Sequence, residues 1–509
     1  MTLTRTLLPA LALAATAVLA PFASAQRGGP DWTTTSGDAQ RTAWVRWDPF
    51  VTPAKIVKPG AFDFLWKVKM DGTAGKPSEA VLISTYIGYR GFKALTVVSG
   101  PDYIYTVDYD LGVPYWSQHY KPATAAPACA TAGPSAIGKL SPLTPNPSRA
   151  ARPAAGYHSV TGKPHEGIPL DAAMGGQLGA AGAPPRVAAP AQALPPGIRF
   201  SVPIFLVTSD GMAHAITFDS GKEAFKPVPF LPPGSAASDL IVVQNVLYAA
   251  TMPGCGSQPN SVYALDVSTP EMKPVGAWTA PSGNVLGAPA FNKAGTLFVA
   301  TDKALFALKP TSLEATTVAE APLASTPIVI TGKTKEWVAA GTKDGNIVLM
   351  DATGSAAAPI SAAAGFTPTA LATADDASGT HWIFATDATK ATGAVHAFKL
   401  VESGATPSLS EVWKSADMAA PARPLIVDGV VFALGTGADR NGGVAKPATK
   451  GTHATVYALD AATGKPLWDS GNTITSFVPS GGIAFNESQL SVSTADNTLY
   501  TFGHPEPHQ

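Results

Sequence analysis

The sequence predicts an all-β protein, a β-propeller built from repeated four-stranded sheets. Three features lead to this fold class: a strand-like segment that recurs along the chain, Asp-Gly and Asp-Asn turns between strands, and a high content of glycine and proline, with 48 and 47 residues. Apolar residues spaced three and four apart, which would indicate helices, are not found. A single core stops growing beyond about 250–300 residues, so 509 residues favour many small sheets that pack on one another.

The recurring segment is clearest at residues 456–468, which read Val-Tyr-Ala-Leu-Asp-Ala-Ala-Thr-Gly-Lys-Pro-Leu-Trp. This pattern predicts a strand, a turn and a second strand that ends in tryptophan. Eight copies of its first half end at Asp108, Asp219, Asp266, Lys309, Asp351, Lys399, Asp460 and Gly503. Five of the seven intervals are 42 to 48 residues long, as is typical of propeller blades, which repeat about every 40–50 residues. We expect eight four-stranded blades, with seven as the alternative if the units ending at Asp219 and Lys309 are incomplete.

The two ends of the repeat array predict how the ring closes. The last copy ends near residue 503 without its final strand, whereas residues 64–69 read as such a final strand without its predecessors. We expect this N-terminal strand to complete the last blade, because closure removes exposed sheet edges. The propeller then spans residues 61–505 and follows an N-terminal extension at 26–60.

A long segment interrupts the repeats. Residues 121–196 are rich in Ala, Pro and Gly and lack strand alternation, which predicts a flexible insertion and explains the 111-residue interval before Asp219. The insertion carries Cys129, and the chain has one other cysteine, Cys255. In an exported protein an isolated pair is most simply a disulfide, with two separate free thiols as the alternative.

The N-terminus and the charge balance predict where the protein acts. Residues 1–25 show a charged start, an apolar run and the triplet Ala-Ser-Ala, which together indicate a signal peptide cleaved after Ala25. The apolar run is short for a membrane span of about 20 residues, and no later stretch qualifies, so we expect a periplasmic or secreted protein. With 35 Lys and Arg against 36 Asp and Glu, and only 14% charged residues, no broad basic face for nucleic acid is expected.

The repeat at 456–468 resembles that of the pyrroloquinoline-quinone (PQQ) type propellers, the quinoprotein family. The start of the predicted mature chain, Asp-Trp-Thr-Thr-Thr-Ser-Gly-Asp-Ala-Gln-Arg-Thr at 31–42, is similar to the opening of quinoprotein dehydrogenases. The resemblance implies a quinoprotein-like propeller. In family enzymes it implies PQQ in the central channel, stacked on a tryptophan and covered by two adjacent bonded cysteines, with calcium or a lanthanide held by Glu, Asn and Asp.

The sequence departs from the enzymes of this family, because its two cysteines are not adjacent. No stretch matches the metal ligands residue by residue, so we assign no catalytic, metal-binding or cofactor-binding residue. PQQ with Ca²⁺ stays open as a cofactor. Tryptophans at the ends of the repeats are expected to be structural, each docking a large ring between neighbouring blades. They are Trp66, Trp116, Trp278, Trp413 and Trp468.

Two functions follow as hypotheses. The first is an exported, non-catalytic binding or scaffold module that binds a protein or small-molecule ligand at a mouth of the propeller. The alternative is a PQQ-dependent periplasmic dehydrogenase that oxidises an alcohol or sugar, since the sugar-oxidising relatives need no cysteine pair. A polysaccharide-binding wall protein is a more distant third. Motifs of serine hydrolases, zinc proteases and P-loop proteins are absent from the sequence.

Overall fold

The computed structural model describes residues 31–71, 77–88, 91–100, 103–121, 135–137, 203–252, 260–333, 335–353, 359–402, 407–440, 448–479 and 481–505. They all belong to one compact unit, made of residues 27–151 and 191–509. The signal peptide predicted at 1–25, both cysteines and most of the insertion predicted at 121–196 lie outside the described residues. A Cys129–Cys255 bridge therefore stays a prediction.

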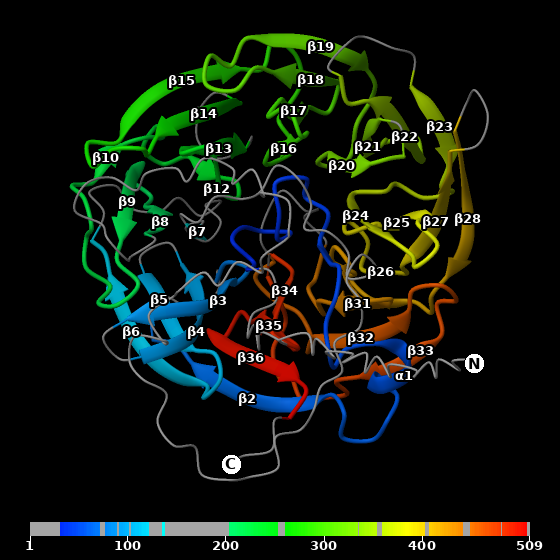
Figure 1. Ribbon diagram of the computed structural model, residues 1–509. Coiled ribbons are helices and arrows are strands. Elements are labelled where there is room, and N and C mark those ends of the chain that lie inside the picture. The colour runs from blue at the N-terminus through cyan, green and yellow to red at the C-terminus, as the bar shows by residue number, and fades with distance from the viewer. Residues whose placement is uncertain are drawn as a thin grey trace, which may run out of the picture. The chain divides into compact units, whose positions relative to one another are not determined.

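The described strands form nine sheets, eight of which are arranged as blades around one axis (Figure 1). Blade 1 contains β3 (Val81–Gly88), β4 (Gly91–Ser99), β5 (Tyr103–Asp108) and β6 (Val113–His119). Blade 2 contains β7 (Ser135–Ile137), β8 (Ile204–Val207), β9 (Met212–Ile216) and β10 (Val228–Pro229). Blade 3 contains β11 (Ala236–Ala237), β12 (Ile241–Val243), β13 (Val246–Met252), β14 (Ser261–Asp266) and β15 (Lys273–Thr279). Blade 4 contains β16 (Ala290–Phe291), β17 (Leu297–Ala300), β18 (Ala304–Leu308) and β19 (Ala315–Glu320).

The second half of the ring repeats this plan. Blade 5 contains β20 (Ile328–Thr331), β21 (Glu336–Gly341), β22 (Asn346–Asp351) and β23 (Ile360–Ala363). Blade 6 contains β24 (Ala370–Asp375), β25 (His381–Thr386), β27 (His396–Val401) and β28 (Ser408–Lys414). Blade 7 contains β30 (Leu425–Val427), β31 (Val430–Gly435), β32 (Thr455–Asp460) and β33 (Pro466–Asp469), with β1 (Trp44–Val45) added beside β30. Blade 8 contains β34 (Ile483–Asn486), β35 (Gln489–Ser493), β36 (Thr498–Gly503) and β2 (Asp63–Lys69).

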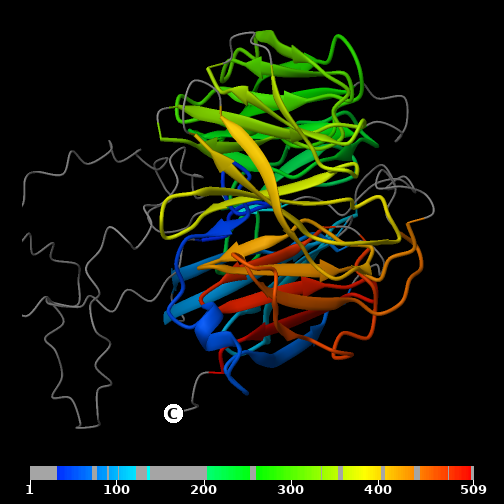
Figure 2. The same ribbon diagram turned by 90° about the vertical axis from the view of Figure 1, so that its right-hand side faces the viewer.

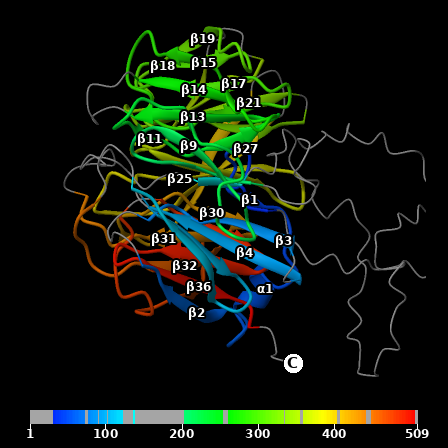
Figure 3. The same cartoon turned by 90° about the vertical axis from the view of Figure 1, so that its left-hand side faces the viewer.

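Few elements lie outside this plan. The short strands β26 (Thr392–Gly393) and β29 (Met418–Ala419) pair with each other. The single helix among the described residues is α1 (Pro53–Ile56), which precedes β2. The two side views show the sheets of the ring from β19 at one end to β2 at the other (Figure 2 and Figure 3). Within the described part of the chain, no helix has the length and apolar character needed to cross a membrane.

The structure confirms eight blades. Each recurring segment found in the sequence forms the third strand of its blade, and the uncertain units ending at Asp219 and Lys309 belong to complete four-stranded sheets, blades 2 and 4. One strand was not expected: β7, the inner strand of blade 2, lies inside the range assigned to the insertion. Three residues are too short a stretch to show alternation among so many alanines.

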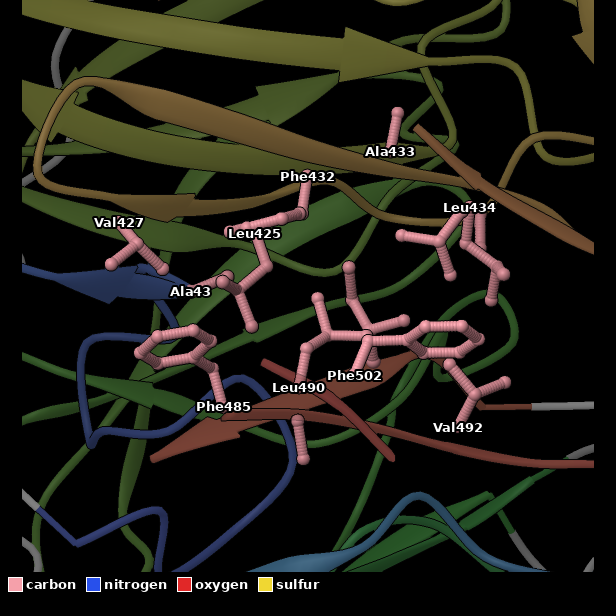
Figure 4. Close-up of a cluster of buried hydrophobic side chains, with 14 of the residues drawn as sticks. Ala43, Leu425, Val427, Phe432, Ala433, Leu434, Phe485, Leu490, Val492 and Phe502 are labelled. Carbon is pink, nitrogen blue, oxygen red and sulfur yellow. The ribbon is translucent and has the colours of Figure 1, made fainter. Parts of the chain in front are cut away.

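The N-terminal strand closes the ring, as predicted. β2 pairs antiparallel with β36, from Asp63 opposite Gly503 to Lys69 opposite Thr498, and so supplies the outer strand of blade 8. On the inside of the ring β3 contacts both β34 and β7, so blade 1 has a neighbour on each side. The hydrophobic core lies between adjacent sheets. Figure 4 shows one part of it, in which Phe432 of blade 7 stacks on Phe485 of blade 8 with ring centroids 6.0 Å apart.

All five tryptophans that the repeat singled out lie on the outer strands β2, β6, β15, β28 and β33. Three of them donate an indole N–H to a carbonyl of the next blade: Trp66 to Tyr109 (3.1 Å), Trp116 to Phe218 (2.6 Å) and Trp413 to Ala461 (3.0 Å). Trp278 instead packs on Phe306 of blade 4, and Trp468 on Phe502 of blade 8. These side chains join one blade to the next.

The turn that receives each of the three bonded rings explains the Asp and Gly of the repeat. In blade 7 the Asp460 carboxylate accepts from the backbone N–H and the hydroxyl of Thr463, at 2.9 and 2.8 Å, and fixes the turn. Gly464 follows with φ +71°. A Cβ on Gly464 would lie 2.6 Å from the Trp413 ring, so the ring packs directly on the glycine backbone. Gly112 under Trp66 and Gly221 under Trp116 repeat this arrangement.

Candidate functional site

The N-terminal segment 31–48, which we call the strap, lies inside the ring (Figure 1). Its backbone exchanges hydrogen bonds with Leu82 of β3 through Trp32, and its later carbonyls accept from the inner strands of four further blades. These acceptor–donor pairs are Ala39 with Phe291, Gln40 with Val329, Thr42 with Thr373 and Ala43 with Ile426. Side chains add Thr34, which donates to the Leu240 carbonyl, and Asp48, which accepts from the Ser488 hydroxyl. Among the residues that the structure describes, the strap thus forms hydrogen bonds with seven blades, all but blade 2.

The local sequence lets the strap follow the ring instead of running straight. Ser36, Gly37, Arg41 and Ala43 all have positive φ, between 52° and 80°. Between them the Asp38 carboxylate accepts from the backbone N–H and the hydroxyl of Thr42, at 2.9 and 2.5 Å, and holds a tight turn. The strap carbonyls also satisfy N–H groups on the innermost strands, which would otherwise face the axis unpaired.

Four polar side chains stand at one repeated position, two residues before an inner strand. They are Glu79 before β3, Asp239 before β12, Thr326 before β20 and Arg423 before β30. Because the blades are related by rotation about the axis, equivalent positions lie at the same level on the inside of the ring. Together with Trp32, Ser36 and Arg41 of the strap they form a group that we call the rim cluster. In blades 4, 6 and 8 the same position holds Ala288, Pro368 and Gly481.

Arg41 is the buried centre of the rim cluster, with an exposed fraction of 3%. Its Nε donates to the Pro289 carbonyl at 3.1 Å, and its Nη1 donates to Thr34 Oγ1 at 3.0 Å and to the Thr35 carbonyl at 2.7 Å. Its Nη2 is buried and has no hydrogen-bond partner among the described residues. Burial lowers the pKa of Arg41 to about 10, opposed by the charge of Asp239, so the guanidinium stays charged at neutral pH.

Arg423 and Glu79 both form hydrogen bonds with one strap residue, Ser36: Arg423 with its side chain and Glu79 with its backbone. The Arg423 Nη1 donates to the Ser36 hydroxyl, and its Nη2 donates to Thr326 Oγ1 at 3.2 Å. The Glu79 Oε1 accepts from the backbone N–H of Ser36 and from the Trp32 indole, both at 3.2 Å. The Arg423 Nε is buried without a partner. Glu79, Asp239 and Arg423 are half-buried, so solvent still reaches each of them.

The electrostatics of the cluster are dominated by burial and by the proximity of two carboxylates. Burial raises the pKa of Glu79 to about 7, and the charge of Asp239 raises it further, against the opposing charge of Arg423. The Asp239 carboxylate makes no hydrogen bond, and Glu79 Oε2 makes none either, among the residues that the structure describes. The cluster therefore holds unused donors on its arginines and unused acceptors on its carboxylates.

The cofactor that the family resemblance implies fits this region only in part. Two arginine side chains with free N–H groups suit the carboxylates of a quinone such as PQQ. A hard cation such as Ca²⁺ needs several oxygen ligands around it. The described residues contain no group of three or more His, Cys, Asp or Glu side chains placed to hold a metal ion. A metal site made of three or more of these side chains is thus not found in that part of the chain.

No residue of the rim cluster was assigned a role from the sequence, although Trp32, Ser36 and Arg41 lie in the segment 31–42 that resembles the opening of quinoprotein dehydrogenases. The five blade tryptophans lie on outer strands, away from it, and the two cysteines lie outside the described residues. The sequence does contain a regular feature at these positions. The residue two positions before each inner strand is an equivalent position of the repeat, and in four blades this residue is polar. This regularity becomes visible only when the inner strands are aligned with one another, whereas the repeat in the sequence is clearest in the third strands.

Known structures share the fold of this chain. Quinohemoprotein alcohol dehydrogenase from Comamonas testosteroni matches with a TM-score of 0.56 and 12% identity, covering 96% of this chain and 83% of its own. Europium-containing methanol dehydrogenase matches with a TM-score of 0.54 and 11% identity, covering 93% and 98%. BamB from Moraxella catarrhalis has a TM-score of 0.47 and 11% identity, covering 88% and 99%. No family model and no curated protein sequence matches the chain. The first two likenesses support the quinoprotein-like propeller at the level of the fold.

Proposed function

We propose that this protein is an exported, non-catalytic binding propeller that holds a small carboxylate-bearing molecule at the rim cluster. One observation carries the proposal: Arg41, with an exposed fraction of 3%, keeps a buried Nη2 without a hydrogen-bond partner among the described residues, and the Nε of Arg423, whose charge acts on Arg41, is buried and unpartnered in the same way. A buried donor left unsatisfied costs about 1–3 kcal/mol. A ligand carboxylate that accepts from both guanidinium groups removes this cost and forms charge-assisted hydrogen bonds.

A PQQ-dependent dehydrogenase is the second candidate, because the same two arginines suit the carboxylates of that quinone. Its activity would need a metal site and a base. We rank the binding module first because the cysteines of the chain are not adjacent, unlike those of the family enzymes that cover PQQ with a cysteine pair, and because no group of three or more His, Cys, Asp or Glu side chains placed for a metal ion is found among the described residues. The two candidates share the anion-binding part of the site and differ in what surrounds it.

Calorimetric titration of the mature protein tests the proposal. Valerate and glutarate serve as probe carboxylates, and PQQ is added with and without Ca²⁺. We expect Arg423→Gln to weaken carboxylate binding about 10- to 100-fold, because a charge-assisted hydrogen bond contributes about 1.5–3 kcal/mol. Arg440→Gln is the matched control, since Arg440 also has a buried, unpartnered Nε but lies outside the cluster.

Three results would count against the proposal. Carboxylates that fail to bind the wild-type chain at millimolar concentration would refute the site. Equal losses in Arg423→Gln and Arg440→Gln would show a general effect of removing a buried charge. Stoichiometric PQQ binding with dye-linked oxidation of alcohols or aldoses would establish the dehydrogenase instead.

A further inference from the structure

The rim cluster carries equal numbers of positive and negative side chains, and these side chains do not form ion pairs with one another. Arg41 and Arg423 face Glu79 and Asp239, and the charges of these four groups influence one another. No ion pair within 4.0 Å joins any two of them, although the structure describes all four side chains. The four charged groups are thus neighbours that form no ion pair with one another, and each keeps at least one polar atom without a hydrogen bond among the described residues.

Ser36 holds the opposite charges in fixed places. Its hydroxyl accepts from Arg423 while its backbone N–H donates to Glu79, so the two groups are anchored to the same residue and not to each other. Arg423 is further fixed by Thr326 of blade 5, and Glu79 by Trp32. These contacts occupy Nη1 and Nη2 of Arg423 and Oε1 of Glu79. Within the described part of the chain, they leave Nε of Arg423, Oε2 of Glu79 and the whole Asp239 carboxylate without hydrogen bonds.

A simple carboxylate does not complement such a cluster. It would satisfy the arginines but bring a third negative charge towards Glu79 and Asp239, which already repel each other. A simple amine would pair with the two carboxylates but bring a third positive charge towards Arg41 and Arg423. Only a ligand with both charges pairs all four groups, in the way that buried charges in proteins are generally compensated.

We infer, on the basis of the proposed function, that the natural ligand is a zwitterion, a small amino-carboxylate. Its carboxylate lies on Arg41 and Arg423, and its ammonium group lies on Glu79 and Asp239. Glu79 and Asp239 are then the residues that determine specificity, and the arginines supply affinity for any carboxylate.

Proton exchange on binding provides an independent readout. The pKa of Glu79 is raised to about 7 by burial and by Asp239, so a fraction of this carboxyl is protonated at neutral pH. An ammonium group beside it favours the ionised form, so a zwitterion should release protons when it binds at pH 7. A ligand with only a carboxylate favours the neutral form and should cause proton uptake. The other charged groups facing Glu79 are Asp239, Arg423 and Arg41.

The experiment compares four five-carbon probes: norvaline, 5-aminovalerate, valerate and pentylamine. Each is titrated into the mature wild-type protein at pH 7 in phosphate and in Tris, whose different heats of ionisation report proton release or uptake. We expect one of the two zwitterions to bind at least about tenfold more tightly than valerate and pentylamine, with proton release. Norvaline and 5-aminovalerate differ in the separation of their charges, so together they report the spacing of the site.

Variants separate specificity from folding. In Glu79→Gln and Asp239→Asn we expect the preference for the zwitterion over valerate to fall about tenfold or more, and proton release to disappear in Glu79→Gln. Glu411→Gln, which removes a carboxylate outside the cluster, should behave as wild type. Thermal melting of each variant shows whether it is folded. If Glu79→Gln does not fold, the binding preference of Asp239→Asn tests the inference instead.

Valerate binding as tightly as both zwitterions, or zwitterion binding with proton uptake, would overturn the inference while leaving the proposed carboxylate site in place. A preference for the zwitterion that survives in both variants would also overturn it. If none of the four probes binds the wild-type protein, the proposed function itself falls, and the inference falls with it.

Discussion

His381 is a buried imidazole held between two carboxylates at the contact of blades 5 and 6. Its exposed fraction is 5%. Its Nδ1 lies 2.5 Å from Asp375 Oδ1, and its Nε2 lies 3.3 Å from Glu402 Oε2. Glu402 in turn accepts from the Trp337 indole at 2.6 Å and from the backbone N–H of Lys333 at 2.9 Å, both on blade 5. A charged His381 therefore supports a contact between blades.

The stability of this contact should depend on pH. Burial alone would lower the pKa of His381, but the hydrogen bond and charge of Asp375, with Glu402, outweigh burial and raise it. A pKa raised on folding stabilises the folded protein fully below the unfolded value of about 6.5, and this contribution is lost as the pH rises through the folded value. We predict that His381→Gln lowers the free energy of unfolding more at pH 6 than at pH 9.

Urea denaturation of wild type and His381→Gln at both pH values measures this difference. His453→Gln is the control, because His453 is exposed and has no carboxylate partner within the described structure. A loss in His381→Gln that is equal at pH 6 and pH 9 would show that the imidazole contributes packing alone.

At the scale of the elements, the contact between an outer-strand tryptophan and the next blade's turn is the recurrent unit of the ring. The repeat in the sequence was sufficient to predict both parts separately, the tryptophan at the end of one strand and a turn with Asp and Gly before it. It did not show that the two parts from neighbouring blades meet, because that contact is set by the packing of sheets. The close approach of Trp413 to Gly464 is visible only in the folded chain.

Gly464 and Gly365 allow this contact to be measured. Both have positive φ, +71° and +74°, but a Cβ at Gly464 meets the Trp413 ring at 2.6 Å, whereas nothing lies within 4 Å of one at Gly365. Gly365→Ala should cost about 1–2 kcal/mol for the left-handed backbone alone. Gly464→Ala should cost about 1–3 kcal/mol more, because it overpacks the contact between blades 6 and 7.

Chemical denaturation of the two alanine variants tests this prediction. Similar losses at both positions would mean that the tryptophan moves aside freely and that the contact contributes little to stability.

At the scale of the whole molecule, the candidate site exists only because the ring is closed. Glu79, Asp239, Thr326 and Arg423 come from four blades, and Arg41 comes from the strap. The sequence predicted the number of blades and the closing strand, since both depend on a local repeat. It did not predict the rim cluster, because side chains separated by up to about 390 residues along the chain meet only when the rotational arrangement of blades is known. The sequence indicated an N-terminal extension at 26–60 but not the path of the strap inside the ring, since a segment with several positive φ values shows no strand periodicity.

The strap should couple the blades in stability. It contacts seven of the eight blades, and Ala39, Ala43 and Val45 of the strap are fully or nearly fully buried. A mature chain that lacks residues 26–46 keeps β2 and so keeps ring closure, but it leaves the inner strands without their hydrogen-bond acceptors. We predict that its melting temperature falls by about 10 °C or more, since each kcal/mol corresponds to about 2–4 °C in a large domain. Deletion of residues 160–180, of equal length within the Ala- and Pro-rich insertion, should cost much less.

Hydrogen exchange distinguishes coupling from a local effect of the strap. The amides of Phe291, Val329, Thr373 and Ile426 donate to strap carbonyls from four different blades. If the strap couples the blades, protection should fall together at all four positions in the truncated chain.

Gly37→Ala provides a milder variant, because a Cβ there would lie 2.7 Å from the Trp32 ring and disturb the first bend of the strap. Unchanged melting of the truncated chain, or loss of protection confined to one blade, would mean that the ring is held by contacts between neighbouring blades alone, and that the strap serves only to place Arg41 and Ser36 at the rim cluster.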